Sequence, residues 1–123
     1  MAEGNLISAY PLEWPAGFER TKFRREPIFK GWSLNYSKGE ILRELGLFKA
    51  KKVIVSTNQS VKTDGDFYAR TRRVEDPGAA VYFTKDEEQL VIACDSFHEL
   101  EDNLHAIART INALRQMERD GAS

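Results

Sequence analysis

The chain has 123 residues, of which 41% are hydrophobic and 30% are charged, and its net charge is −1. This length supports one globular domain with a single core, and the composition excludes a disordered or membrane-spanning chain. The longest apolar runs, such as residues 90–94, fall far below the roughly 18 residues of a membrane span.

One cysteine, Cys94, precludes an internal disulfide, and residues 1–5 carry no basic or apolar region of a secretory leader. We therefore expect a protein of the reducing cytoplasm that makes no contact with a membrane.

The small net charge conceals a basic part and an acidic part. Residues 14–73 contain 14 Lys and Arg against 6 Asp and Glu, a net of +8, whereas residues 74–123 contain 4 against 11, a net of −7. Such a chain can present a basic face to phosphates, pair its own two halves, or stack against a second copy.

Residues 1–36 are predicted to form an irregular N-terminal arm, because Pro11 and Pro15 prevent a regular helix. Aromatic residues recur along it: Tyr10, Trp14, Phe18, Phe23, Phe29 and Trp32. Aromatic side chains anchor such segments on a folded body, so we expect an arm that docks rather than a free tail.

A capping box of Ser37 with Glu40 predicts a short helix over residues 38–45, which Gly46 would end. Four strands are predicted to follow, over residues 52–57, 67–73, 79–84 and 89–94. Residues 85–88 connect the last two as a polar hairpin, and those two strands carry apolar groups on both faces, which favours a central place.

The last predicted element is a long helix over residues 97–118, with a second capping box, Ser96 with Glu99, at its start. Its apolar stripe has spacings of three and four: Phe97, Leu100, Leu104, Ile107, Ile111 and Leu114. The expected fold is α+β (α-β-β-β-β-α), with an antiparallel sheet of about four strands, a short N-terminal helix and a long C-terminal helix. Residues 37–123 would form this single domain, and its apolar strands or long helix offer surfaces for a homodimer.

The only cluster of metal-ligand residue types follows the last predicted strand. It comprises Asp95, His98, Asp102 and His105, with Cys94 before it. On a helix, His98, Asp102 and His105 share one face, where they could hold zinc or another divalent ion. Acids in the first turn of a helix also favour its dipole, which explains them without a metal.

A basic and aromatic stretch is the best candidate for contact with phosphates. It comprises Arg20, Lys22, Phe23, Arg24 and Arg25, and a strand face with Tyr68, Arg70 and Arg72 would extend it, as would Lys49, Lys51 and Lys52. Nucleic-acid binders combine such charge with aromatic rings on which bases stack. A solvated basic surface is the alternative. No phosphate-binding loop, dinucleotide fingerprint or hydrolase elbow is present, so no cofactor is expected.

Three segments resemble a family of uncharacterised bacterial, phage and plasmid proteins: residues 10–15 (YPLEWP), 73–83 (RVEDPGAAVYF) and 93–111, with Glu101-Asp102-Asn103-Leu104 within it. Members often continue into a C-terminal J domain, which stimulates heat-shock chaperones. This chain has no His-Pro-Asp tripeptide, so J-domain activity is not expected. The resemblance implies a mobile genetic element and an accessory role, and it supplies no catalytic residues.

A second similarity is to prophage Holliday-junction resolvases, through the Pro-Trp-Pro-like start, Asp102-Asn103-Leu104 and Ala113-Leu114. Those enzymes carry an acid two positions before the Asp, where this chain has Leu100.

Three hypotheses follow. The first is a non-enzymatic binding module that contacts nucleic acid or a macromolecular partner through its basic half. The second is a divalent-metal nuclease that uses Asp102 with Asp95 or Glu99. The third is an inhibitor or partner of a host protein that acts through its acidic half, in which Glu87, Glu88 and Glu101 would matter.

Overall fold

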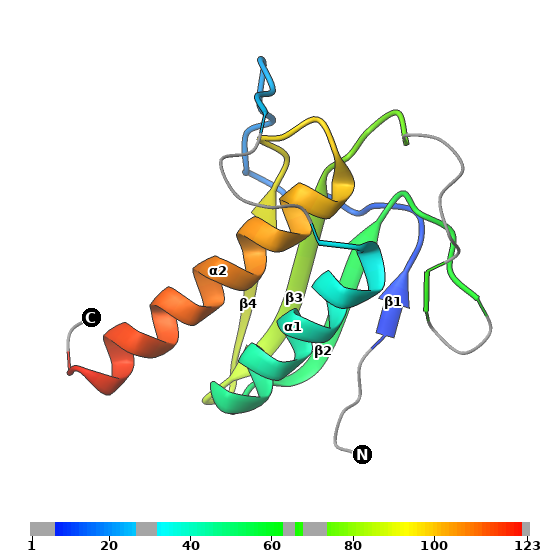
Figure 1. Cartoon of the computed structure of the whole chain (residues 1–123). Coiled ribbons are helices and arrows are strands. Elements are labelled where there is room, and N and C mark those ends of the chain that lie inside the picture. Colours follow the sequence, from blue (N-terminus) through cyan, green and yellow to red (C-terminus); the bar gives the residue numbers. More distant parts are fainter. Residues whose placement is uncertain (1–6, 27–31, 63–65, 68–73, 122–123) are drawn as a thin grey trace.

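The computed structural model describes residues 7–26, 32–62, 66–67 and 74–121. Its elements in chain order are β1 (Ile7–Ala9), α1 (Leu34–Leu47), β2 (Lys51–Thr57), β3 (Ala79–Lys85), β4 (Glu88–Cys94) and α2 (Leu100–Arg119). The two helices lie side by side against one face of the sheet (Figure 1).

The four strands form one mixed sheet in the order β1-β2-β3-β4. β2, β3 and β4 are antiparallel neighbours, whereas β1 lies parallel to β2 with Ile7 opposite Ile54. The predicted α+β fold, with its N-terminal helix and long C-terminal helix, is confirmed. The sheet is mixed rather than antiparallel because β1 comes from the arm expected to be irregular. Its three residues are too few to show a strand period.

The predicted strand over residues 67–73 lies outside the described residues except for Phe67. This residue is buried and forms an isolated bridge with Val61. The side chain of Asn35 in α1 accepts a hydrogen bond from the Phe67 N–H and donates one to its carbonyl oxygen. Phe67 is therefore part of the core whatever the path of the residues after it.

The other three predicted strands correspond to β2, β3 and β4, and the predicted hairpin is confirmed. The central place expected for the last two strands holds for β3 but is wrong for β4, which lies at the edge of the sheet. Asp86 and Glu87 form its two-residue turn with φ angles of 53° and 68°. Positive φ at both positions is the geometry that matches the twist of the flanking strands.

Helix α1 begins one turn before the predicted capping box. Ser33 is its N-cap, because its hydroxyl accepts from the Tyr36 N–H at 3.1 Å, and Ser37 is buried inside the helix. The predicted end at Gly46 is also wrong. The N–H groups of Lys49 and Ala50 donate to the carbonyl oxygens of Gly46 and Leu45, a Schellman ending with Lys49 in the left-handed region.

Helix α2 begins at Leu100 rather than at the predicted Phe97, so the capping box at Ser96 is wrong. The reason is the side chain of Asn103, which is fully buried. Its amide accepts from the Phe97 N–H and donates to the carbonyl oxygens of Phe97 and Pro77. These bonds fix the residues before Leu100 as a loop, and the predicted apolar stripe follows as expected.

The core lies between the helices and the sheet. The fully buried side chains of Ile41 and Leu45 from α1 pack with Leu104 and Ile107 from α2 and with Val55 from β2. Among the described residues, neither helix combines the length and the apolar character needed to cross a membrane.

The opposite face of the sheet, on which none of the described residues forms a helix, is crossed by residues 10–26, here called the crossing segment. The N–H of Glu13 donates to Ser56 Oγ of β2 at 2.7 Å, and Tyr82 of β3 donates its hydroxyl to the Glu13 carbonyl oxygen at 2.6 Å. The segment then reaches the end of β4, where the Arg25 N–H donates to the Ser96 carbonyl oxygen. The crossing segment of the predicted arm therefore docks on the sheet, but the bonds that hold it are polar, and its aromatic residues Phe18 and Phe23 are exposed.

Candidate functional site

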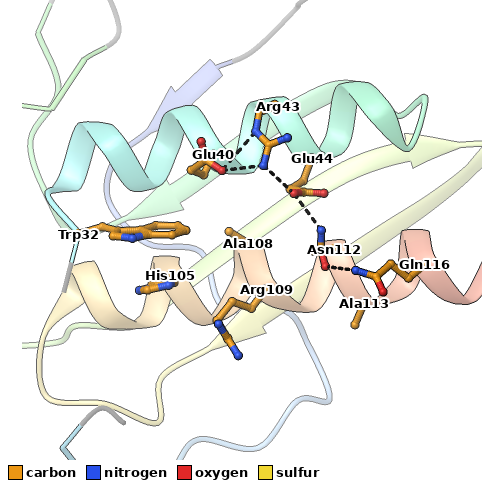
Figure 2. A pocket seen from close by; sticks show the side chains of 10 residues that line it. All are labelled: Trp32, Glu40, Arg43, Glu44, His105, Ala108, Arg109, Asn112, Ala113 and Gln116. Atoms are coloured by element: carbon orange, nitrogen blue, oxygen red, sulfur yellow. Dashed lines mark hydrogen bonds and ion pairs between the residues drawn. The ribbon is translucent and has the colours of Figure 1, made fainter. Parts of the chain in front are cut away.

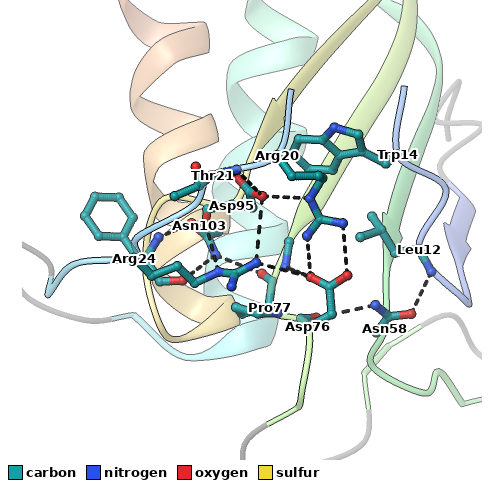
Figure 3. Close-up of polar contacts among 12 residues, drawn as sticks. Leu12, Trp14, Arg20, Thr21, Arg24, Asn58, Asp76, Pro77, Asp95 and Asn103 are labelled. Carbon is teal, nitrogen blue, oxygen red and sulfur yellow. Dashed lines mark hydrogen bonds and ion pairs between the residues drawn. The ribbon is translucent and has the colours of Figure 1, made fainter. Parts of the chain in front are cut away.

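The predicted basic stretch meets a buried carboxylate at the end of β4 (Figure 3). Asp95, whose side chain is 4% exposed, accepts from Arg20 Nε at 2.7 Å and from the Thr21 N–H at 3.0 Å. Arg24 donates from Nε to the Asp95 carbonyl oxygen. Burial raises the pKa of the Asp95 carboxyl, but the bonds from Thr21 and Arg20 outweigh burial and hold the pKa below its ordinary value.

A second carboxylate completes this network. The Asp76 carboxylate accepts hydrogen bonds from both terminal nitrogens of Arg20, at 2.6 and 3.1 Å, and from the Gly78 N–H. Burial raises the pKa of the Asp76 carboxyl, but the hydrogen bonds from Arg20 and Gly78 have the larger effect. The pKa of Asp76 therefore lies below its ordinary value. The guanidinium of Arg20 lies 4.4 Å from the Trp14 ring centroid, so it also anchors this aromatic residue.

The charge division of the sequence is thus partly neutralised inside the molecule. Arg20 and Arg24 pair with Asp76 and Asp95 of the acidic part, and Arg25 lies over the Phe97 ring at 4.9 Å. Lys22 and Phe23, the other predicted binding residues in the crossing segment, take no part in these contacts and are exposed, Phe23 at 89%. The remaining three, Tyr68, Arg70 and Arg72, lie outside the described residues.

The four predicted metal ligands occupy different surroundings. Asp95 belongs to the arginine network, His98 lies in the loop before α2, Asp102 is buried in the first turn of α2, and His105 is buried one turn later. His105 stacks on Trp32 with 3.5 Å between ring centroids. Among the described residues, no three His, Cys, Asp or Glu side chains form a group that could hold a metal ion.

Cys94 also has a structural place. Burial raises the pKa of its thiol, and the thiol donates to Asn103 Oδ1 at 3.3 Å. A protonated, half-buried thiol is a poor nucleophile. Cys94 instead helps to orient the amide that fixes the start of α2.

A polar pocket of about 440 Å³ lies between the two helices (Figure 2). Its centre is the buried carboxylate of Glu44, which accepts from Arg115 Nε at 3.0 Å, from Asn112 Nδ2 at 3.1 Å and from Arg43 at 3.0 Å. The stacked pair of Trp32 and His105 lies at one end. Because three donors already satisfy Glu44, this carboxylate serves to join α1 to α2.

A larger groove of about 1040 Å³ lies on the helix-free face, between the crossing segment and the sheet. Its aromatic lining comes from Tyr10 and Trp14 of the crossing segment and from Tyr82 and Phe83 of β3. Ile54 of β2 adds apolar surface. Burial raises the pKa of the Tyr82 phenol, and the Glu13 charge adds to this rise, so its hydroxyl remains a donor to the crossing segment.

Lysines lie where this groove meets the start of β2. Lys52 lines the groove, and Lys49 and Lys51 are exposed beside it around a second hollow of about 400 Å³. Lys49 and Lys52 have φ angles of 66° and 57°, in the left-handed region that glycine favours. The sequence pattern named these lysines as an extension of the basic stretch, but it did not indicate Tyr82, whose role depends on the strand register.

Searches against models of protein families, curated proteins and solved structures find no match to this chain.

Proposed function

We propose that this chain is a non-enzymatic binding module that takes single-stranded nucleic acid along the groove on the helix-free face of the sheet. The observation that carries the proposal is the left-handed Lys52 in the lining of an aromatic groove, with the left-handed Lys49 in the adjoining hollow that Lys52 also lines.

Glycine adopts the left-handed conformation without the steric cost that a side chain incurs. A non-glycine residue in this region costs on the order of 1–2 kcal/mol, and such positions cluster at functional sites. Lys49 follows the end of α1 and Lys52 lies in the irregular start of β2, so either position would be less strained as glycine. Because both side chains are exposed, packing does not explain why they are lysines.

The groove supports an extended occupant with flat rings. Tyr10 is 56% exposed, and Tyr10, Trp14 and Tyr82 line the same hollow, whose other end reaches Lys52. Proteins bind single strands by stacking bases on aromatic rings while cations follow the backbone. An open groove on one sheet face admits a single strand more readily than the wide cylinder of a duplex.

Arg20 and Arg24 take a supporting role in this proposal. Their ion pairs with Asp76 and Asp95 fix the crossing segment, which forms one wall of the groove. Lys22 and Phe23 remain a separate exposed surface, and the experiment below distinguishes the two.

The test is binding of a labelled single-stranded oligonucleotide over a range of salt concentrations, with the double variant Lys49→Gly and Lys52→Gly. We expect this variant to be at least as stable as the parent because glycine relieves both strained positions. Its affinity should fall at least tenfold. The slope of log K against log salt should shrink by about 0.7 for each phosphate that the variant no longer neutralises.

The matched control is Asp86→Gly with Glu87→Gly, since these hairpin residues also have positive φ but carry negative charges. This control should gain stability in the same way and keep its affinity. Equal affinity of the parent and the lysine variant would overturn the proposal. So would binding that disappears in Lys22→Ala with Phe23→Ala but persists in the lysine variant, because the exposed arm would then be the binding surface.

A further inference from the structure

The last strand of the sheet has a free edge. β4 ends the strand order, and within the described part of the chain no strand pairs with its outer side. Arg25 bridges to Phe97 only beyond the end of β4. The opposite edge differs, because β1 has only three residues.

The backbone groups on this edge follow from the hairpin. Lys85 and Glu88 close a two-residue turn, so they form a hydrogen-bonded pair, and such pairs alternate along an antiparallel ladder. Leu90, Ile92 and Cys94 therefore bond to β3. The N–H and carbonyl groups of Gln89, Val91 and Ala93 point outward.

β4 lacks the features by which proteins protect an exposed edge. Those features are charges, proline, bulges and short length. β4 has seven residues, pairs with β3 without a bulge, and carries no charge from residue 89 to residue 94. A strand of this kind is a template for another strand.

We propose that β4 is the interface of a homodimer, in which the β4 strands of two copies pair antiparallel about a two-fold axis at Val91. In this register Val91 lies opposite Val91 of the second copy, and Gln89 lies opposite Ala93. All three outward-facing residues are then paired, through about six backbone hydrogen bonds. Within the strand, Glu88 lies opposite Cys94, so no like charges meet there. Just beyond it Glu87 lies near Asp95, whose charge is already paired with Arg20 and Arg24.

Helix α2 gives a second reason for choosing a second copy as the partner. Its C-terminal half extends past the β4 edge of the sheet (Figure 1). Met117 on this half is 43% exposed, and Leu90 on the helix side of β4 is 39% exposed. A second sheet joined edge to edge brings its own β4 beneath this overhang, so both apolar side chains become covered by symmetry.

The experiment is sedimentation velocity on the full chain at micromolar concentrations, with Val91→Lys and Val91→Glu. Gln89 and Leu90 of β4 line the groove proposed for nucleic acid, but Val91 does not. Because sedimentation of the chain without nucleic acid measures only the oligomeric state, the two proposals can fail separately. The parent should sediment as a dimer. Each variant alone should be a monomer, because like charges would meet on the axis, and an equal mixture of the two should restore the dimer.

Ile7→Lys is the matched control, because Ile7 is exposed on the same face at the opposite edge, and this variant should remain a dimer. Circular dichroism and thermal unfolding establish that each variant is folded. A monomeric parent would overturn the proposal, as would a dimer that persists in Val91→Lys. If the single variants prove unfolded, the same test is applied to Val91→Pro, which removes an outward-pointing N–H that the second copy needs but no hydrogen bond to β3.

Discussion

The two faces of the sheet are covered by different means. On one face, α1 and α2 bury apolar side chains, and Ile41, Leu104 and Val55 have no exposed surface. On the other face, the crossing segment is attached through polar bonds to Ser56, Tyr82 and Asn58. Apolar side chains pack closely in any orientation, so they leave no open space between the helices and the sheet. Single hydrogen bonds hold the crossing segment only at separate points, so a groove remains between it and the sheet.

This difference suggests a division of roles. The helix-covered face provides stability, and under the proposed function the other face provides a binding surface whose shape depends on the crossing segment. Substitutions at Leu104, Asp95 and Tyr82 test this division.

Leu104→Ala tests the helix-covered face. Leu104 is fully buried, so its truncation should lower the free energy of unfolding by about 3 kcal/mol through reduced burial and a cavity. Urea denaturation measures the change. The comparison is Tyr10→Ala in the groove, which should change stability by less than about 0.5 kcal/mol because Tyr10 is largely exposed. Similar changes in both variants would remove the distinction between the faces.

Asp95→Asn tests the anchor of the crossing segment. It removes the charge that Arg20 and Arg24 face, so we expect stability to fall by about 2 kcal/mol at neutral pH. Proteolysis of the crossing segment should become faster, and binding to single strands should weaken. Glu88→Gln, an exposed acid on the hairpin, is the control and should leave all three measurements unchanged.

The ion pair of Asp95 with Arg20 predicts a pH dependence of stability. The folded-state pKa of Asp95 lies below its unfolded value of about 3.9, so the carboxylate stabilises the fold fully above that pH. This stabilisation is lost as the pH falls through the folded-state pKa. The stability difference between the parent and Asp95→Asn should therefore be constant near neutral pH and shrink below about pH 4. A constant difference down to lower pH would mean that the charge is not what holds the segment.

Tyr82→Phe separates the two roles of Tyr82. The variant keeps the ring in the groove but loses the 2.6 Å bond to the Glu13 carbonyl oxygen, so stability should fall by about 1 kcal/mol. Amide exchange at Glu13 should accelerate, because its N–H bond to Ser56 is then less well held. Tyr36→Phe, on the exposed side of α1, should change neither quantity. Unchanged exchange at Glu13 would show that the other bonds suffice to fix the segment.

Much of the fold follows from local patterns in the sequence. The stripe from Leu100 to Ile111 predicted α2, and the polar residues between β3 and β4 predicted the hairpin, because both patterns repeat with the period of their element. The capping boxes misled, since Ser37 and Ser96 have the required spacing but lie inside a helix and inside a loop. A cap motif spans only four residues, so contacts with residues distant in sequence decide whether a helix starts there. The hydrogen bond from Asn103 to the Pro77 carbonyl oxygen is such a contact.

The candidate site was less predictable for the same reason. Local sequence was enough to show that aromatic and basic residues crowd the N-terminal part, that acids crowd the C-terminal part, and that a hairpin and one long helix close the chain. The pairing of Arg20 with Asp95, 75 residues away, and the shared groove of Tyr82 and Trp14 arise only in the folded chain. The left-handed backbones of Lys49 and Lys52 were equally hidden from sequence patterns. Composition and period are properties of neighbouring residues, whereas the partner of a charge and the wall of a groove depend on which strands meet when the chain folds.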